Sequence, residues 1–139
     1  HKLDNLIVIV DCNNLQSLTT VKDTLNLEPL RDKFESFGSH VIIVNGHDHF
    51  ELNGVFKDAI NINTKPVVII ANTVKGKGVS YMENKVKWHY STPNDVELQT
   101  AINEIFQLLL KINQLLQFLF FLTIQIKLHF DFQLLLPEV

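Results

Sequence analysis

The chain has 139 residues, a mass of 16.0 kDa and a formal net charge of −3, which fits one domain of ordinary size. Because 46% of its residues are apolar, it can form a packed core, and disorder is excluded as its main state. A pI near 6.0 without a basic run argues against nucleic-acid binding, which needs cations to neutralise phosphates. One cysteine, Cys12, excludes an internal disulfide, and the first residues do not resemble a signal peptide, so we expect a cytoplasmic protein.

Three short apolar runs predict β-strands at 6–10, 41–44 and 67–71. The first and third are rich in Val and Ile without polar alternation, which is typical of strands buried on both faces of a parallel sheet.

Helix signals separate and follow these strands. Glu28-Pro29-Leu30 begins one helix, which Gly38 ends, and Asp48 begins another with Glu51 at capping-box spacing. A last helix is predicted from Thr92-Pro93-Asn94-Asp95, with Thr92 as its N-cap. The order predicts an α/β protein, a three-layer α/β/α fold with a parallel sheet and right-handed crossovers.

In such sheets ligands bind at the carboxyl ends of the strands, which places the loops 11–16 and 72–78 at the expected site. In the first loop, the amide oxygen of Asn13 and an exposed backbone carbonyl are oxygen ligands that suit Mg²⁺, but the spacing alone favours an Asx turn that ends the strand. In the second, Lys75-Gly76-Lys77-Gly78 offers amides and ammonium groups to an anion such as a diphosphate. The alternative is a solvated basic loop.

Three further places in the sequence, each containing histidine or cysteine, have weaker signals. His89, beside Trp88, could contact a phosphate or move a proton, but a histidine considered alone is more often a surface residue. In His47-Asp48-His49 we interpret Asp48 mainly as a helix cap rather than as a metal ligand. Cys12 is interpreted as a small buried residue.

The composition changes near residue 105, since only four of the 27 charged residues follow it. We therefore divide the chain into residues 1–105 and an apolar tail, 106–139. The tail has helical spacing up to Leu119 and then a period of two from Ile124 to Leu134, which predicts a one-sided strand. No membrane span is expected, because the longest unbroken apolar run is Phe118 to Leu122. The tail is either foreign to the domain or a cover for strands that have lost their neighbours.

Several segments of residues 1–105 resemble transketolases in order and spacing. They are Lys2–Asp11 with Asn13-Asn14-Leu15-Gln16, Val44–Asp48, Lys65-Pro66, Thr73–Ser80, Trp88-His89, and Pro93-Asn94-Asp95 with Glu97-Leu98. The resemblance implies the later part of a thiamine diphosphate-binding domain. It also implies a cofactor-dependent transfer of a two-carbon ketol unit between sugar phosphates, as in the pentose phosphate pathway.

The resemblance assigns roles to four residues. It makes Asn13 a ligand of Mg²⁺ or Ca²⁺ through its side chain and Leu15 a ligand through its carbonyl. It places Lys75 near the cofactor, and His89 at the diphosphate and at the substrate end of the active site. It further implies a homo-oligomer.

The family's metal motif begins with Gly-Asp-Gly about thirty residues before the asparagine, whereas this sequence begins twelve residues before Asn13. We therefore expect the chain to be inactive alone and to need the remaining transketolase segments or a second subunit. The alternatives are a non-catalytic remnant or interaction protein that keeps only the fold, and a generic phosphate binder that uses the Lys75 loop.

Overall fold

The computed structural model describes residues 3–133, with side chains up to Leu122. It forms two compact units, His1–Thr92 and Pro93–Val139, which are described separately. The first unit contains β1 (Ile7–Cys12), α1 (Val21–Thr24), α2 (Leu30–Ser36), β2 (His40–Asn45), α3 (His49–Ala59), β3 (Val67–Asn72) and the 3₁₀ helix η1 (Val86–His89). The second is built on one helix, α4 (Asp95–Gln133).

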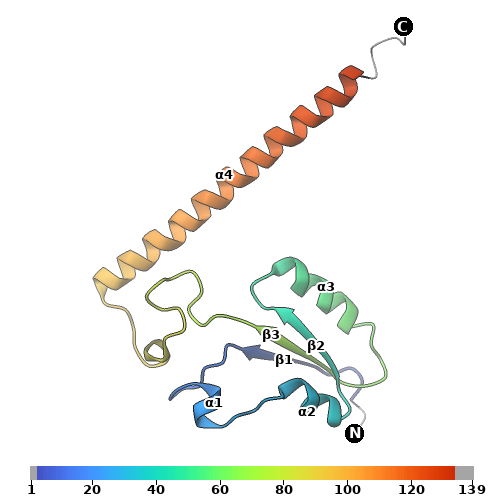
Figure 1. Cartoon of the computed structure of the whole chain (residues 1–139), viewed down its shortest axis with the longest axis vertical. Helices are drawn as coiled ribbons and strands as arrows, with labels where there is room; N and C mark the ends of the chain where they lie inside the picture. Colours follow the sequence, from blue (N-terminus) through green and yellow to red (C-terminus); the bar gives the residue numbers. More distant parts are fainter. Residues whose placement is uncertain (1–2, 134–139) are drawn as a thin grey trace. The chain divides into compact units, whose positions relative to one another are not determined.

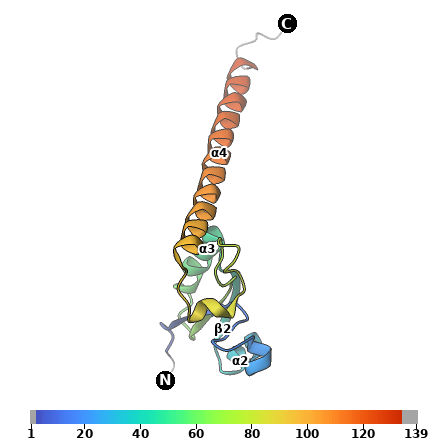
Figure 2. The ribbon, with the colours of Figure 1, turned by 90° about the vertical axis from the view of Figure 1, so that its left-hand side faces the viewer.

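The three strands form a parallel sheet in the order β1-β3-β2 (Figure 1). The chain passes from β1 over to β2 and then returns to β3 in the middle. Two crossovers of the same hand that run in opposite directions place their helices on opposite faces of a sheet. α2 and α3 accordingly lie on opposite sides of the strands (Figure 2). The predicted three-layer α/β/α fold is confirmed.

Each face of the sheet has its own apolar cluster. On one face, Leu52 and Val55 of α3 pack against a cluster that contains Val44, Val67 and Ile69. On the other face, Leu30 and Phe34 of α2 pack against Val41, Val68 and Ile70. β3 therefore supplies the centre of both clusters, because consecutive side chains of a strand point to opposite faces.

β3 is buried from Val67 to Ala71, as predicted. The prediction that the first strand is buried on both faces is wrong. No residue of β1 is fully buried, and Ile9 exposes 56% of its surface. The physical reason is position, since β1 pairs with a strand on one side only among the described residues, and α3 covers the sheet over β2 and β3 more than over β1.

The ends of α2 and α3 follow local signals. Asp48 caps α3, and its carboxylate accepts hydrogen bonds from the amides of Phe50 and Glu51 at 2.8 and 3.0 Å. Glu51 reaches back to the amide of Asn45 at the end of β2, rather than to the cap residue. α2 ends before Gly38, whose N–H donates to the Glu35 carbonyl.

α4 runs without interruption from Asp95 to Gln133. Its cap is Asn94 and not Thr92, because Asn94 and Glu97 exchange side-chain-to-amide hydrogen bonds of 2.9 Å in both directions. The prediction of a strand from Ile124 is wrong as far as Gln133, and Leu134 lies outside the described residues. A helix satisfies its backbone groups within itself, whereas a strand needs a neighbour, and no neighbouring strand is described there. By length and composition, Asp95–Leu122 is also apolar enough to cross a membrane.

Candidate functional site

The loops after all three strands meet at the carboxyl edge of the sheet. The Thr73 N–H donates to the Cys12 carbonyl at 3.1 Å, and the Thr73 hydroxyl donates to the carboxylate of Asp11. The N–H of the next residue, Val74, donates to Nε2 of His47 at 2.7 Å. The loop after β3 is therefore held by the end of β1 on one side and by the loop after β2 on the other.

Gly46 allows this close approach between the loops after β2 and β3. A Cβ atom at Gly46 would lie 2.4 Å from Cγ2 of Thr73 and 3.1 Å from the Asn72 carbonyl oxygen. The Gly46 N–H donates to that same carbonyl at 2.8 Å. A side chain at this position would push the two loops apart.

Asn13 begins a tight turn directly after β1. Its Oδ1 accepts a hydrogen bond of 3.0 Å from the Leu15 N–H, which makes it the Asx turn that was the alternative for this residue. Asn14 follows with a φ of 60°, and its carbonyl accepts from the Val21 N–H, so the loop folds back onto the start of α1. The turn does not exclude a ligand role, because an amide oxygen has a second lone pair.

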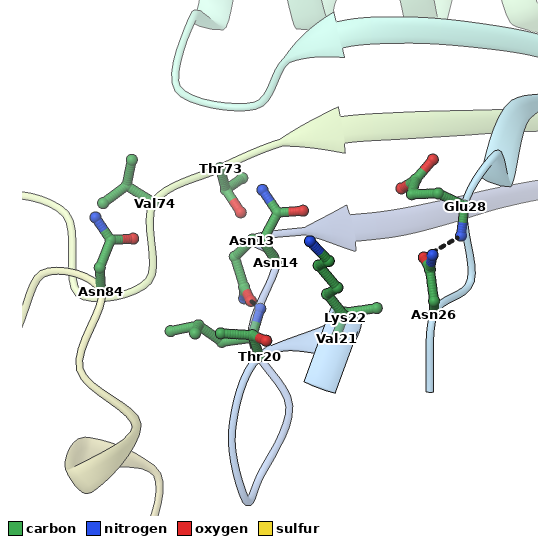
Figure 3. Close-up of a pocket in the computed structure, with 11 residues that line it drawn as sticks. Asn13, Asn14, Thr20, Val21, Lys22, Asn26, Glu28, Thr73, Val74 and Asn84 are labelled. Carbon is green, nitrogen blue, oxygen red and sulfur yellow. Dashed lines mark hydrogen bonds between the residues drawn. The ribbon is translucent and has the colours of Figure 1, made fainter. Parts of the chain in front are cut away.

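A pocket of about 790 Å³ lies where these loops meet (Figure 3). This volume is within the range of small-molecule sites, about 300–1,000 Å³. Figure 3 shows Asn13 and Asn14 after the end of β1, with Thr73 and Val74 after the end of β3. The pocket is lined by Asn13, Asn14, Leu15, Thr20, Val21, Lys22, Asn26, Glu28, Thr73, Val74 and Asn84.

The structure thus brings Asn13 and Leu15 together in one wall, as the two predicted metal ligands require. Sequence reasoning did not single out Lys22 and Glu28, which carry the charges among the lining side chains. Lys22 points from α1 toward the end of β1 (Figure 3). A possible signal was their place in the segment after the first strand, which belongs to the carboxyl edge of the sheet.

The Lys75 loop is tightly turned. Gly76 has a φ of +74°, and a Cβ there would lie 2.7 Å from the carbonyl oxygen of Met82. The Gly78 N–H donates to the Glu83 carboxylate at 3.1 Å, and the Lys77 ammonium is 4.0 Å from the same oxygen. The carboxylate of Glu83 therefore interacts with the Gly78 amide and the Lys77 ammonium group, both of which were expected to face a diphosphate.

Lys75 and His89 are not among the residues that line the pocket. Lys75 follows the lining residue Val74, and its carbonyl accepts from the N–H of Asn84, another lining residue, at 3.0 Å. His89 is exposed at the end of η1, and its ring lies edge-on to the Tyr90 ring with the two ring centroids 4.6 Å apart. The preceding Trp88 is anchored by its indole N–H, which donates to the Tyr81 carbonyl at 3.0 Å.

The remaining candidates have structural roles. His47 holds the loop after β3, and Asp48 caps α3 as predicted. Cys12 is half-buried beside the α2-side cluster. Its burial raises the pKa of the thiol above the ordinary value, and the negative charges of Glu28 and Asp11 raise it further, partly opposed by a hydrogen bond from the Asn14 backbone. A protonated thiol is a poor nucleophile.

The donor set fits part of a Mg²⁺ site. Mg²⁺ prefers six oxygen ligands and binds through a few protein groups together with phosphate oxygens. The pocket offers the neutral oxygens of Asn13 and Leu15. The carboxylates of Asp11 and of the lining residue Glu28 accept hydrogen bonds from Thr73 and from the Leu30 N–H, and no group of three or more His, Cys, Asp or Glu side chains that could hold a metal ion occurs among the described residues.

Comparisons with known proteins agree with this architecture. The family model of the transketolase thiamine diphosphate binding domain matches residues 1–106. One subunit of the apulose-4-phosphate transketolase of Phocaeicola vulgatus is 39% identical over 105 residues, which are 76% of this chain and 37% of that protein. The protein of the same name from Actinobacillus succinogenes is 41% identical, over 76% of this chain and 38% of that one. The chain thus spans less than two-fifths of these relatives' lengths.

Solved structures give the same result. The crystal structure of transketolase from Campylobacter jejuni is 35% identical, with a TM-score of 0.69, over 76% of this chain and 16% of that one. Residues 1–106, which the family model matches, contain the sheet, the pocket and the beginning of α4. The chain therefore belongs to the transketolase family, within its thiamine diphosphate binding domain.

Proposed function

We propose that this chain supplies part of the thiamine diphosphate and Mg²⁺ site of a transketolase that transfers two-carbon ketol units between sugar phosphates. One observation carries the proposal: Asn13 and Leu15, from the loop after β1, line the same pocket as Thr73 and Val74, from the loop after β3. The family assignment makes thiamine diphosphate the cofactor class of this domain. When bound, the cofactor supplies the reactive carbon that carries the ketol unit.

The residues of this chain would bind and orient. The Asn13 side-chain oxygen and the Leu15 carbonyl would give Mg²⁺ two of its six ligands. Lys75 would lie near the diphosphate, and His89 would contact the diphosphate and the substrate end. The hydrogen bond from Val74 to His47 would keep the Lys75 loop against the pocket, because Lys75 directly follows Val74.

The site needs a partner in this proposal. Two neutral oxygens do not complete an octahedral shell or balance the charge of Mg²⁺. The relatives from Phocaeicola and Actinobacillus are each named as one subunit of a transketolase. We propose that a polypeptide with the family's Gly-Asp-Gly segment, in the same chain or in a second subunit, supplies the missing carboxylate. Assembly of the whole enzyme as a homo-oligomer is part of the same proposal.

The test is a calorimetric titration of thiamine diphosphate with Mg²⁺, with and without a polypeptide that carries the upstream segment. Binding is expected only in its presence, and addition of a chelator should abolish it. Asn13→Ala should weaken the metal-dependent binding at least tenfold. Asn13→Asp should retain it, because a carboxylate keeps both the Leu15 hydrogen bond and the oxygen ligand.

Two other outcomes point to the alternatives. If no binding occurs even with the upstream segment, the chain is a non-catalytic remnant or interaction protein. The contact of Glu83 with Gly78 and Lys77 favours that candidate, since it places negative charge where a diphosphate was expected. If inorganic phosphate competes equally and no metal is required, the pocket is a generic phosphate site.

A further inference from the structure

α4 carries an apolar stripe with a strict seven-residue repeat. Steps of seven from Leu98 reach Ile105, Ile112 and Leu119, and Ile126 continues the series in the sequence. The positions three residues further on are also apolar, namely Ala101, Leu108, Leu115 and Leu122. Alternating steps of three and four over more than three such repeats are typical of a coiled coil. We call these first and fourth positions the seam.

From Leu98 to Leu122 polar residues avoid the seam, whereas the next fourth and first positions of α4, His129 and Gln133, are polar. Nine polar residues lie between Leu98 and Gln117, and none occupies the first, fourth or fifth position of the repeat. They are Gln99, Thr100, Asn103, Glu104, Gln107, Lys111, Asn113, Gln114 and Gln117. On a helix this spacing separates one apolar stripe from a polar outer face.

Except for Ala101, which is buried, the described seam residues are exposed. From Ile105 to Leu122 its six members each leave 44–57% of their surface exposed. Its length from Leu98 to Leu122 is about 37 Å at the helical rise of 1.5 Å per residue. Such a strip is long enough for knobs-into-holes contact over more than three repeats.

We propose that the seam pairs with the same seam of a second copy of this chain, as a parallel two-stranded coiled coil. The residue types select this occupant. In the middle of the seam, isoleucine at first positions 105 and 112, with leucine at fourth positions 108, 115 and 122, is the combination that favours two parallel strands, while the outer first positions 98 and 119 are leucine. Because both helices have the same seven-residue repeat, each seam side chain of one copy can pack into a hole between seam side chains of the other. This surface lies in α4, apart from the pocket, so the inference does not depend on the proposed transketolase activity.

The flanking positions agree with this pairing. The fifth positions are Ile102, Leu109 and Leu116, and in a parallel pair they lie beside the seventh-position side chains of the partner copy. Those seventh positions include Glu104 and Lys111, whose methylene groups can cover an apolar neighbour while the charge stays in water. No like charges face each other across the seam in this arrangement.

A membrane fits the same helix less well. Insertion would bury Gln107, Lys111, Asn113, Gln114 and Gln117 in hydrocarbon, where polar side chains are strongly unfavourable. In the coiled coil the same residues lie on the outer face in water. Membrane insertion is therefore kept as an outcome of the test.

The first measurement is the mass of the full chain in detergent-free buffer, by light scattering during gel filtration. We expect a dimer of about 32 kDa, twice the 16.0 kDa chain mass. The double variant Ile112→Lys with Leu115→Lys should be monomeric, because it places four charges in the paired seam. The control, Phe106→Lys with Leu110→Lys, changes equally apolar exposed residues outside the seam and should remain dimeric.

Orientation is tested by crosslinking. With Cys12→Ser in the background, Leu115→Cys should form a disulfide-linked dimer, because equivalent fourth positions of an in-register parallel pair are adjacent. Gln107→Cys, on the outer face, should not. Dilution of the unmodified chain, followed by its helical circular dichroism, tests pairing without any variant, and Trp88 fluorescence checks that the first unit stays folded.

Each of the following results overturns the proposal: a monomeric, trimeric or larger unmodified chain, equal loss of mass in both lysine variants, or a dimer without the Leu115→Cys crosslink. Flotation of the chain with phosphatidylcholine vesicles, without a soluble dimer, would also overturn it and would assign α4 to the membrane instead.

Discussion

β3 and α4 are both strongly apolar, but their environments are opposite. Val67 to Ala71 of β3 expose at most 6% of their surfaces, whereas the large apolar residues of α4 from Ile102 to Leu122 each expose at least 39%. β3 has a strand on either side and a helix over each face, all supplied by the same unit. Burial of an apolar segment is thus favourable, but in the described chain it occurs only where other elements surround the segment.

The two regions can be followed separately in one experiment. Trp88, the single tryptophan, lies in the first unit and reports its unfolding by fluorescence. α4 has 39 residues, far more than α1, α2 and α3 together, so it dominates the helical circular dichroism.

Ile69→Ala should cost the first unit about 2–5 kcal/mol of unfolding free energy, because Ile69 is fully buried and the change leaves a cavity. Leu110→Ala in α4 removes a similar apolar volume from an exposed position. It should change the unfolding free energy of the first unit by less than about 0.5 kcal/mol. Urea unfolding followed by Trp88 fluorescence measures both. Equal losses in the two variants would mean that β3 is not the centre of the core.

Gly46→Ala should destabilise the first unit by about 1–3 kcal/mol, because the new methyl group would collide with Thr73 and with the Asn72 carbonyl. Gly54→Ala, in the middle of α3 with open space around it, is the matched control. It should stabilise by about 0.5–1 kcal/mol, since alanine favours a helix. The same urea titration checks both, and a neutral Gly46→Ala would contradict the close approach of the loops after β2 and β3.

Asp48→Ala should lower the free energy of unfolding of the first unit by about 1 kcal/mol, because the amides of Phe50 and Glu51 lose their acceptor. Asp48→Asn should lose only a few tenths, since asparagine is also a good N-cap. Thermal unfolding of the two variants separates the cap from a metal role for this residue. A metal role would instead make the stability of the unmodified chain sensitive to a chelator.

The smallest effect concerns Cys12. Because burial and nearby carboxylates raise the thiol pKa above the ordinary 9.0, alkylation by iodoacetamide near pH 9 should be slower in the folded chain than in urea. Because the pKa of the Cys12 thiol is higher in the folded chain than in the unfolded chain, the protonated thiol contributes stability that is complete below pH 9. This contribution is lost as the pH rises through the pKa of the folded state. Glu28→Gln should moderately accelerate alkylation, because burial, the larger cause, remains. An unchanged rate would exclude Glu28 as a contributor.

The alternation of elements and the caps were readable from the sequence because their signals are local. Asp48 bonds to amides two and three residues away, and Asn13 to an amide two residues away. Thr92 and Asn94 were harder to separate, since both are good N-caps and only the partner Glu97 distinguishes them. The period-two pattern after Ile124 failed for a related reason, because alternation has meaning only when a second strand pairs with it.

The loops that form the candidate site could be predicted from the sequence, but not all of the residues that line its pocket. The loops 11–16 and 72–78 follow from the rule that parallel sheets bind ligands at their carboxyl ends, whereas Leu15 was singled out only by the resemblance to transketolases. Lys22 and Glu28 entered only through the path of the chain after β1. The place of His89 relative to the pocket depends on the long connection between β3 and α4, in which no periodic pattern constrains the backbone.

The α/β class, the position of each strand, the Asp48 cap and membership of the transketolase family can be read from the sequence, because they depend on short-range patterns and on motifs in a given order. The folded chain was needed to show that β3 is central and β1 lies at the edge, that Asp11 and Thr73 meet across 62 residues, and that α4 remains helical to Gln133. The physical reason is that strand order, burial and register are properties of pairs of segments, and no segment contains its own partner.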